Sequence, residues 1–184
     1  MLSIVRALTC VAACVALSGC AAVLLPIPSR LIDHDTEKTP VELQAIQTRE
    51  FDSDKSRLVS VFITVFQDAG YIIDQADLAT GLITARAPVE NRLLALGEIL
   101  PNTKAEFLKT TPTNYKLQTD RTFNVLVTDI AAKRSKARVS INIQLKITPD
   151  KIFAPYSGLD TNADQYQAIF SKAQQGLFLK KNIE

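Results

Sequence analysis

Hydrophobic and polar positions alternate most regularly over residues 138–147. The apolar positions are Val139, Ile141, Ile143, Leu145 and Ile147, and the positions between them are Ser140, Asn142, Gln144 and Lys146. A period of two with one polar face predicts a strand in an antiparallel sheet that has one side in water. Residues 123–131 form a second apolar run, and the polar turn at residues 133–136 joins the two segments into a predicted hairpin.

Two other segments repeat their apolar residues at helical spacing. The first follows Ser53, the expected N-cap, and ends before Gly70, where we expect a left-handed C′ residue. Its apolar stripe consists of Leu58, Phe62, Val65, Phe66 and Ala69. The second covers residues 162–181, with Thr161 as the expected N-cap. Its stripe consists of Tyr166, Ile169, Phe170, Ala173, Leu177 and Phe178.

Shorter apolar segments predict the rest of the sheet. Residues 43–51 contain no Gly or Pro and indicate a first strand with weak alternation. Residues 71–73 and 82–86 predict a second hairpin, which turns at residues 77–81. These elements follow the order β-α-β-β-insert-β-β-α. The order is typical of an α+β fold, with an antiparallel sheet of about five strands and two long helices on one face. The other face is then open to solvent or to a partner.

Residues 87–118 interrupt this pattern and are interpreted as an insert. Within them, residues 91–100 predict a short helix that ends at Pro101. A connection of this length is usually functional or disordered. One interpretation is that its leucines cover one end of the core. The alternative is a lid, or a docking helix for a partner.

The N-terminus has the composition of a secretory signal over residues 1–19. Arg6 supplies the positive charge, and an apolar stretch of residues 7–17 rises only about 16 Å as a helix, too short to cross a bilayer. The Leu-Ser-Gly-Cys sequence that ends at Cys20 resembles a bacterial lipobox, which implies that Cys20 is lipidated and becomes the mature N-terminus. The alternative is an ordinary signal peptide in which Cys20 is incidental.

Lipidation at Cys20 fixes several further expectations. The other two cysteines, Cys10 and Cys14, leave with the signal, so the mature domain folds without disulfides. Two or three acyl chains give stable membrane anchoring. By analogy with enteric lipoproteins, Ala21 favours the outer membrane over the inner one. Residues 20–40 form a tether that spans about 65 Å when fully extended, and residues 41–184 form a single domain.

The composition of the mature chain argues against nucleic-acid binding. Without the signal, 165 of the 184 residues remain, enough for one domain with its own core. The mature chain has 20 Lys and Arg against 19 Asp and Glu, a net charge of +1. Nucleic-acid binding needs a strong positive field, so we expect no nucleic-acid partner. We also expect no cofactor.

Candidate catalytic and metal-binding residues are few. Asp68, Asp74 and Asp77 cluster around a turn, but no His or Cys lies close to them, so we interpret them as solvated turn residues. His34 is the only histidine and lies in the tether, where a general base would have no fixed geometry. No Gly-x-Ser-x-Gly sequence is present. We therefore assign no catalytic residues and no metal ligands.

The basic turn is the one candidate contact surface. Lys133, Arg134, Lys136 and Arg138 place four cations within six residues at the predicted hairpin tip. Such a cluster suits lipid headgroups or an acidic partner. The alternative interpretation is a solvated turn whose charges discourage pairing between sheet edges.

Several short motifs together resemble a known family. They are Thr-Arg-Glu-Phe at residues 48–51, the helix end at 66–71, Gly-Leu-Ile-Thr-Ala at 81–85, and the segments 166–170 and 177–179. The set resembles a family of small proteobacterial lipoproteins without an established activity. The helix followed by a two-stranded turn is also similar, more loosely, to the helix-grip domains of the barrel-assembly lipoprotein C family. Neither resemblance implies catalytic residues.

We expect a non-enzymatic lipoprotein anchored in the outer membrane and facing the periplasm. It would act as an interaction or accessory module with a protein partner in the envelope. The alternative function is a periplasmic carrier of an apolar ligand. A carrier requires an apolar cavity of roughly 300 Å³ or more, whereas a docking module has a filled core and an exposed patch.

Overall fold

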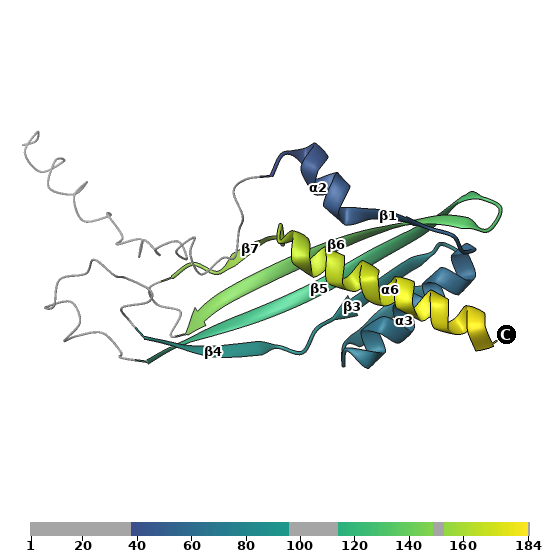
Figure 1. The fold of residues 1–184 in the computed structure, drawn as a ribbon. Helices are drawn as coiled ribbons and strands as arrows, with labels where there is room; N and C mark the ends of the chain where they lie inside the picture. The colour runs from purple at the N-terminus through teal and green to yellow at the C-terminus, as the bar shows by residue number, and fades with distance from the viewer. Residues whose placement is uncertain (1–37, 96–113, 149–152, 184) are drawn as a thin grey trace, which may run out of the picture.

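The computed structural model describes residues 38–95, 114–148 and 153–183 (Figure 1). The predicted signal, Cys20 and His34 lie outside the described residues, as do residues 96–113 of the predicted insert. The elements are α2 (Pro40–Gln47), β1 (Thr48–Phe51), α3 (Lys55–Asp68), β2 (Ile72–Asp77), β3 (Leu82–Arg86), β4 (Glu90–Ala95), β5 (Asn114–Ala131), β6 (Arg134–Thr148), β7 (Tyr156–Leu159) and α6 (Ala163–Ile183).

A long antiparallel hairpin, β5–β6, forms the centre of the sheet. Two strands pair along the free edge of β5, with β4 at its start and β3 further along, and β2 continues the sheet beyond β3. Two strands pair along the free edge of β6, namely β1 near the turn of the hairpin and β7 further along. The described strands thus form one antiparallel sheet of seven strands.

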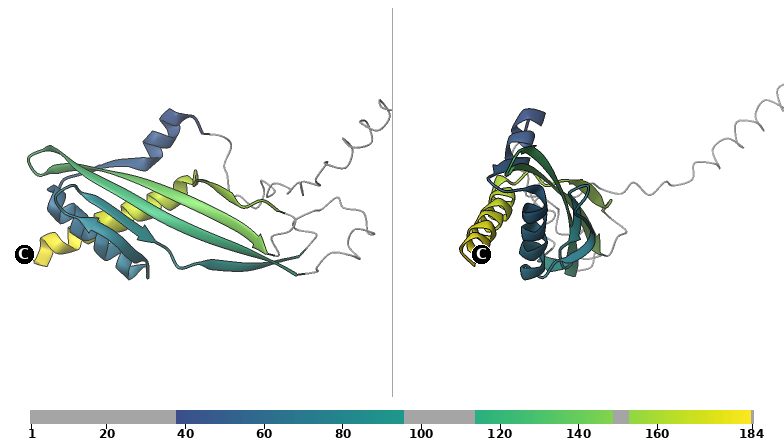
Figure 2. Two further views of the ribbon diagram at one scale, coloured as in Figure 1. Left: turned by 180° about the vertical axis from the view of Figure 1, so that it is seen from behind. Right: turned by 90° about the vertical axis from the view of Figure 1, so that its right-hand side faces the viewer.

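Helices α3 and α6 both pack on the same face of this curved sheet (Figure 2). The expected α+β fold with two long helices on one face is therefore confirmed. The predicted alternation of β6 is also confirmed, because its odd-numbered residues from Ser135 to Ile147 are buried and its even-numbered residues are exposed or half-buried. We call the face away from the two helices the outer face.

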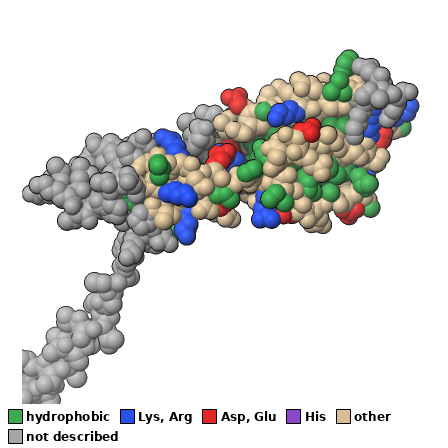
Figure 3. Space-filling view, turned by 90° about the horizontal axis from the view of Figure 1, so that it is seen from below, with side chains coloured by type: hydrophobic (Ala, Val, Ile, Leu, Met, Phe, Trp, Pro, Cys, Tyr) green, Lys and Arg blue, Asp and Glu red, His purple; other side chains and the backbone are tan. Residues whose placement is uncertain are grey.

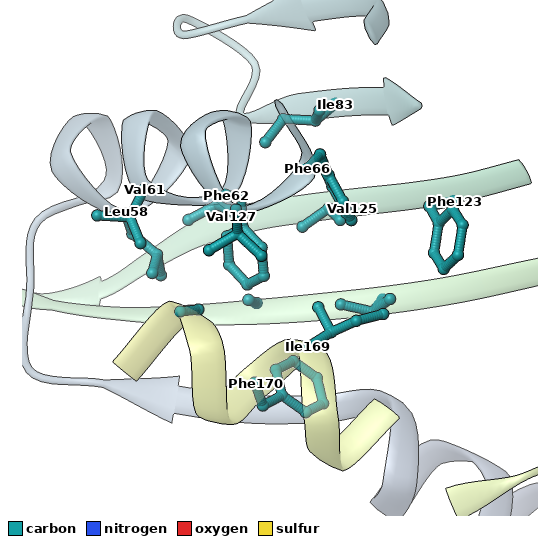
Figure 4. Close-up of a cluster of buried hydrophobic side chains, with 14 of the residues drawn as sticks. Leu58, Val61, Phe62, Phe66, Ile83, Phe123, Val125, Val127, Ile169 and Phe170 are labelled. Carbon is teal, nitrogen blue, oxygen red and sulfur yellow. The ribbon is translucent and has the colours of Figure 1, made fainter. Parts of the chain in front are cut away.

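The larger hydrophobic cluster fills the space between the helices and the sheet (Figure 4). Helix α3 contributes Leu58, Phe62 and Phe66, and α6 contributes Ile169 and Phe170, all from the predicted stripes. The facing strands contribute Ile83, Phe123, Val125, Val127, Val139 and Ile141. Burial of several aromatic and branched side chains, each worth about 1.5–3 kcal/mol, is the main stabilising contribution.

A smaller cluster lies on the same face at the other end of the hairpin. It contains Leu94, Tyr115, Leu117, Ile143, Leu145, Ile147 and Phe153, with Tyr156 packed against it. The long hairpin therefore carries two hydrophobic clusters along one face.

The predicted strand over residues 43–51 is wrong in its first half. Helix α2 occupies Pro40–Gln47, and only Thr48–Phe51 form a strand. A capping box explains the helix, since the Thr39 hydroxyl accepts from the Glu42 amide and the Glu42 carboxylate accepts from the Thr39 amide at 2.8 Å. Pro40 at the first position supports the same start.

The predicted insert at residues 87–118 also needs correction. Strand β4 covers Glu90–Ala95, so residues 91–95 of the predicted helix over residues 91–100 form a strand instead. Strand β5 begins at Asn114 rather than near Phe123. The pairing of β4 with the first residues of β5 covers an edge of that long strand and buries Leu94 in a hydrophobic cluster. Strands β4 and β7, neither of which was predicted, raise the sheet from the predicted five strands to seven.

Two helix starts shift by one residue. Asp54, not Ser53, caps α3, because its carboxylate accepts from the Arg57 amide at 2.9 Å. Asn162, not Thr161, directly precedes α6, and its side-chain oxygen accepts from the Asp164 amide at 3.0 Å. At the end of α3, Gly70 adopts the predicted left-handed conformation with φ +75°.

Candidate functional site

The turn of the β5–β6 hairpin divides the four predicted cations between two sides of the sheet. The turn occupies only residues 132–133, and strand β6 already begins at Arg134. Lys133 has a φ of +57° and lines a groove with residues of α3 and α6, among them Arg57 and Phe178. The remaining three cations alternate along β6 with buried residues, so they lie on the outer face.

These three cations differ in what holds them. Arg134 forms an ion pair with Glu50 of β1, with Nη2 and Oε2 2.6 Å apart and both side chains more than half exposed. Arg138 donates to the side-chain oxygen of Gln47 at 3.4 Å. Lys136 lies opposite Glu50 in the β1–β6 register and is exposed. The ion pair is solvated and adds little stability. Because three exposed cations face one carboxylate, this row presents net positive charge to solvent.

Exposed aliphatic side chains lie beside the row of cations. Leu126 of β5 is 44% exposed and pairs with Arg138 across the hairpin. Ile130, close to the turn, is 48% exposed. Leu126 therefore lies beside Arg138 on the outer face, and Ile130 lies at the bulge between Asp129 and Ala131 at the same end of the hairpin. We call Leu126, Ile130, Arg134, Lys136 and Arg138 the hairpin patch.

Hydrogen bonds connect the strands of the hairpin patch to the start of α3. The Ser135 hydroxyl, fully buried behind the patch, donates to the carbonyl oxygen of Ser53 at 2.8 Å and contacts the Asp129 carboxylate at 3.2 Å. The same carboxylate accepts from the Lys55 amide at 3.2 Å. These contacts fix the hairpin to the start of α3, so the patch keeps its shape.

A polar group that sequence reasoning missed lies between the two hydrophobic clusters. Arg121, on the inward face of β5, contacts the Glu90 carboxylate at 2.9 Å, and its Nε lies 4.0 Å from the Asp160 carboxylate. Asp160 is buried, and its backbone oxygen accepts from the Tyr166 hydroxyl at 2.6 Å. The available signal was the position of Arg121 itself, a charged residue in an inward-facing register of β5.

This polar group is organised as a structural junction. Asp160 also accepts from the Asn162 amide at 2.9 Å, which fixes the start of α6. Burial raises the pKa of Tyr166, so its hydroxyl remains a donor. The group ties β4, β5 and the start of α6 together at the point where the hydrophobic face changes from one cluster to the other.

The carboxylates near the β2–β3 turn do not converge. Asp74 accepts two hydrogen bonds from Arg86, at 2.7 Å each, and these bonds lower its pKa. Asp77 accepts from the Thr80 hydroxyl and the Ala79 amide, which lower its pKa as well. Asp68 lies on α3, away from the turn. Among the described residues, no group of three or more His, Cys, Asp and Glu could hold a metal ion.

A shallow apolar groove of about 370 Å³ separates α3 from the C-terminal half of α6. Val61, Val65 and Leu179 line it, and Gly176 lets the helices approach closely. Leu179 and the neighbouring Phe178 are 60% and 65% exposed. Seen from below, hydrophobic side chains reach the surface in several places between polar ones (Figure 3). No helix in the described part of the chain is long and apolar enough to span a membrane.

Comparisons with known proteins add little to this picture. No protein-family model and no curated protein matches the chain. One similar solved structure is a DUF4468 family protein from Bacteroides ovatus, with 9% sequence identity and a TM-score of 0.33. The alignment covers 74% of this chain and 80% of that chain. A similarity this low carries no argument about function.

Proposed function

We propose that this protein is a lipid-anchored, non-enzymatic accessory module of the outer membrane, with Cys20 as the lipidated residue. The observation that supports it best is the one-sided sheet, whose helices cover a single face. The outer face bears uncharged polar residues at its centre, including Thr122, Asn124 and Asn142, and the hairpin patch at one end. A rigid open face of this kind suits docking to an envelope protein.

The described polar groups favour an interaction role over catalysis. Asp74 and Asp77 are occupied by hydrogen bonds within their own hairpin. Arg121 and Asp160 join structural elements around a helix start. An acid–base pair needs groups that converge on a site a substrate can reach, and these groups serve the fold instead.

A carrier of an apolar ligand is the second candidate. The groove between α3 and α6 exceeds the minimum volume that such a ligand requires, at about 370 Å³. It lies at the surface, whereas the space between the helices and the sheet is filled by the larger cluster. The carrier would therefore hold its ligand between the helices and not against the sheet.

Photocrosslinking in intact cells separates the two functions. One photoreactive side chain replaces Gln144 on the outer face, and another replaces Leu179 in the helix groove, each with and without Cys20→Ser. We expect one reproducible protein adduct at position 144, reduced several-fold by Cys20→Ser. Lipid adducts at position 179 without a protein adduct at 144 would favour the carrier. Adducts at neither position would overturn both.

A further inference from the structure

We propose that the hairpin patch binds the surface of a membrane that contains anionic phospholipid and holds this end of the domain against the bilayer. The inference rests on the proposed lipid anchor and specifies how the domain is oriented above it. It assigns the hairpin patch to the membrane and leaves the centre of the outer face to the protein partner.

The cations of the patch form a positively charged row on one strand. Arg134, Lys136 and Arg138 occupy alternate positions of one strand, so their side chains leave the same face in a row about 13 Å long. Glu50 is the acidic side chain paired with this row. Three cations against one carboxylate leave the row with a net charge of +2. Such a row matches the negative potential of an anionic leaflet.

The exposed aliphatic residues favour a membrane over an acidic protein segment. Leu126 is almost half exposed beside Arg138, and Ile130, at the bulge before the turn, is exposed to a similar extent. None of the five residues of the patch is aromatic. Protein interfaces concentrate their binding energy in aromatic residues and arginine. Aliphatic side chains flanked by long cationic ones suit the interfacial region of a bilayer, where the charged ends stay in water and their stems lie along the lipid.

The described chain enters the sheet beside the patch, because β1 is the strand that pairs with the row of cations. The tether leads directly into α2 at Pro40, a helix of eight residues that rises about 12 Å. Strand β1 follows without a break and pairs with β6, so that Thr48 lies opposite Arg138. An anchored chain raises the effective concentration of the membrane at a nearby surface. A patch of three cations and two aliphatic residues is then sufficient for contact.

A fluorescence experiment on the mature, acylated protein tests the proposal. A solvent-sensitive fluorescent side chain replaces Thr128, which is exposed beside Lys136, or Thr148, at the opposite end of β6. The protein is added to vesicles of phosphatidylcholine, with or without phosphatidylglycerol. We expect a blue shift at position 128 only when phosphatidylglycerol is present, no shift at position 148, and loss of the shift in high salt.

Charge reversal provides a matched pair of variants. Lys136→Glu with Arg138→Glu is expected to abolish the shift, whereas Lys116→Glu with Lys146→Glu, which lie on the same face at the far end, is expected to leave it unchanged. The comparison between the two vesicle types needs no variant, so it remains decisive if a charge reversal impairs folding.

Vesicle flotation, measured in parallel, separates the two proposals. If the protein floats but the side chain at position 128 stays in water on anionic vesicles, the patch proposal is overturned while the anchor stands. The row would then be free for an acidic protein partner. Equal shifts at positions 128 and 148 would also overturn it, because the whole outer face would lie on the bilayer. If mass spectrometry of the mature protein finds no acyl chain on Cys20, the anchor is wrong. The fluorescence comparison is then made with the protein coupled through Cys20 to a maleimide lipid, so the patch is still tested.

Discussion

At the scale of single residues, Gly81 shows how closely the turn between β2 and β3 approaches β5. Its φ is +78°, and a Cβ atom there would overlap the backbone carbonyl of Val127. The Gly81 oxygen also accepts from the Val127 amide at 2.9 Å, so the two backbones cannot separate freely. Gly70 has a similar φ of +75°, but a Cβ atom there would meet nothing within 4 Å.

These two glycines separate steric overlap from backbone strain. Gly70→Ala is expected to lower the free energy of unfolding by about 1 kcal/mol, the cost of a left-handed alanine. Gly81→Ala is expected to lower it by about 3 kcal/mol, because the same strain is joined by the overlap with Val127. Urea denaturation of both variants measures the difference, and equal losses would contradict the close approach.

At the scale of elements, Ser135 connects the hairpin to the start of α3. The residue is fully buried, and its hydroxyl satisfies the Ser53 carbonyl oxygen. A buried acceptor that loses its partner destabilises the folded state by about 1–3 kcal/mol. The contact therefore links the strand that carries the hairpin patch to the helix that carries the core.

Replacement of this hydroxyl tests the link. Ser135→Ala is expected to lower the free energy of unfolding by about 2 kcal/mol, while Ser140→Ala, on the outer face of the same strand, is expected to change it by less than about 0.5 kcal/mol. Urea denaturation again provides the measurement. A loss at Ser140 as large as that at Ser135 would show that the effect comes from strand propensity and not from the link.

At the scale of the whole molecule, we expect the free energy of unfolding to decrease at both acidic and alkaline pH. The pKa values of Asp54, Asp74 and Asp77 are lowered, each chiefly by hydrogen bonds to the carboxylate. Near pH 4 the unfolded chain therefore binds more protons than the folded one, so this stabilisation is present above that pH and disappears as the pH falls. Burial raises the pKa values of Tyr115 and Tyr166, so their contribution is present below about pH 10 and disappears above it.

We therefore expect the thermal unfolding midpoint to be constant between about pH 5 and pH 9 and to fall on both sides. Circular dichroism melting curves measure it. Tyr115→Phe removes the ionisable hydroxyl without removing a hydrogen bond, because the buried Tyr115 hydroxyl has no hydrogen-bond partner among the described residues. The variant should melt like the parent at pH 7 and lose less stability above pH 10. An unchanged alkaline loss would contradict the assignment to Tyr115.

Local patterns were enough to predict the two long helices and strand β6. The stripe of α3, its left-handed Gly70 and the alternation of β6 each depend on neighbours a few residues away. The failures occurred where two local signals competed. Residues 43–47 lacked a clear period, and the capping box of Thr39 and Glu42 outweighed their apolar content. In β4, adjacent leucines fit a helix or a strand equally well until pairing with β5 decided between them.

The candidate surface was predictable only in part. The sequence identified a cluster of four cations, Lys133, Arg134, Lys136 and Arg138. In the structure, Lys133 lies in the turn and lines a groove with α3 and α6, whereas the other three lie on the outer face of β6. The exposed Leu126 joins them through the register of the hairpin. The inward register of Arg121 was a signal in the sequence, but its contact with Asp160 depends on how β5 and the start of α6 pack.

The sequence by itself determined the fold class, the inward face of β6 and most of the buried faces of the two long helices, because periodicity records burial locally. The predicted lipid anchor at Cys20 also depends on the sequence alone, because a lipobox is a linear motif. Only the tertiary structure decided which strands pair, where the hairpin patch forms and what surrounds Arg121. Those features join residues far apart in the chain, and their energies depend on register and packing that no single segment encodes.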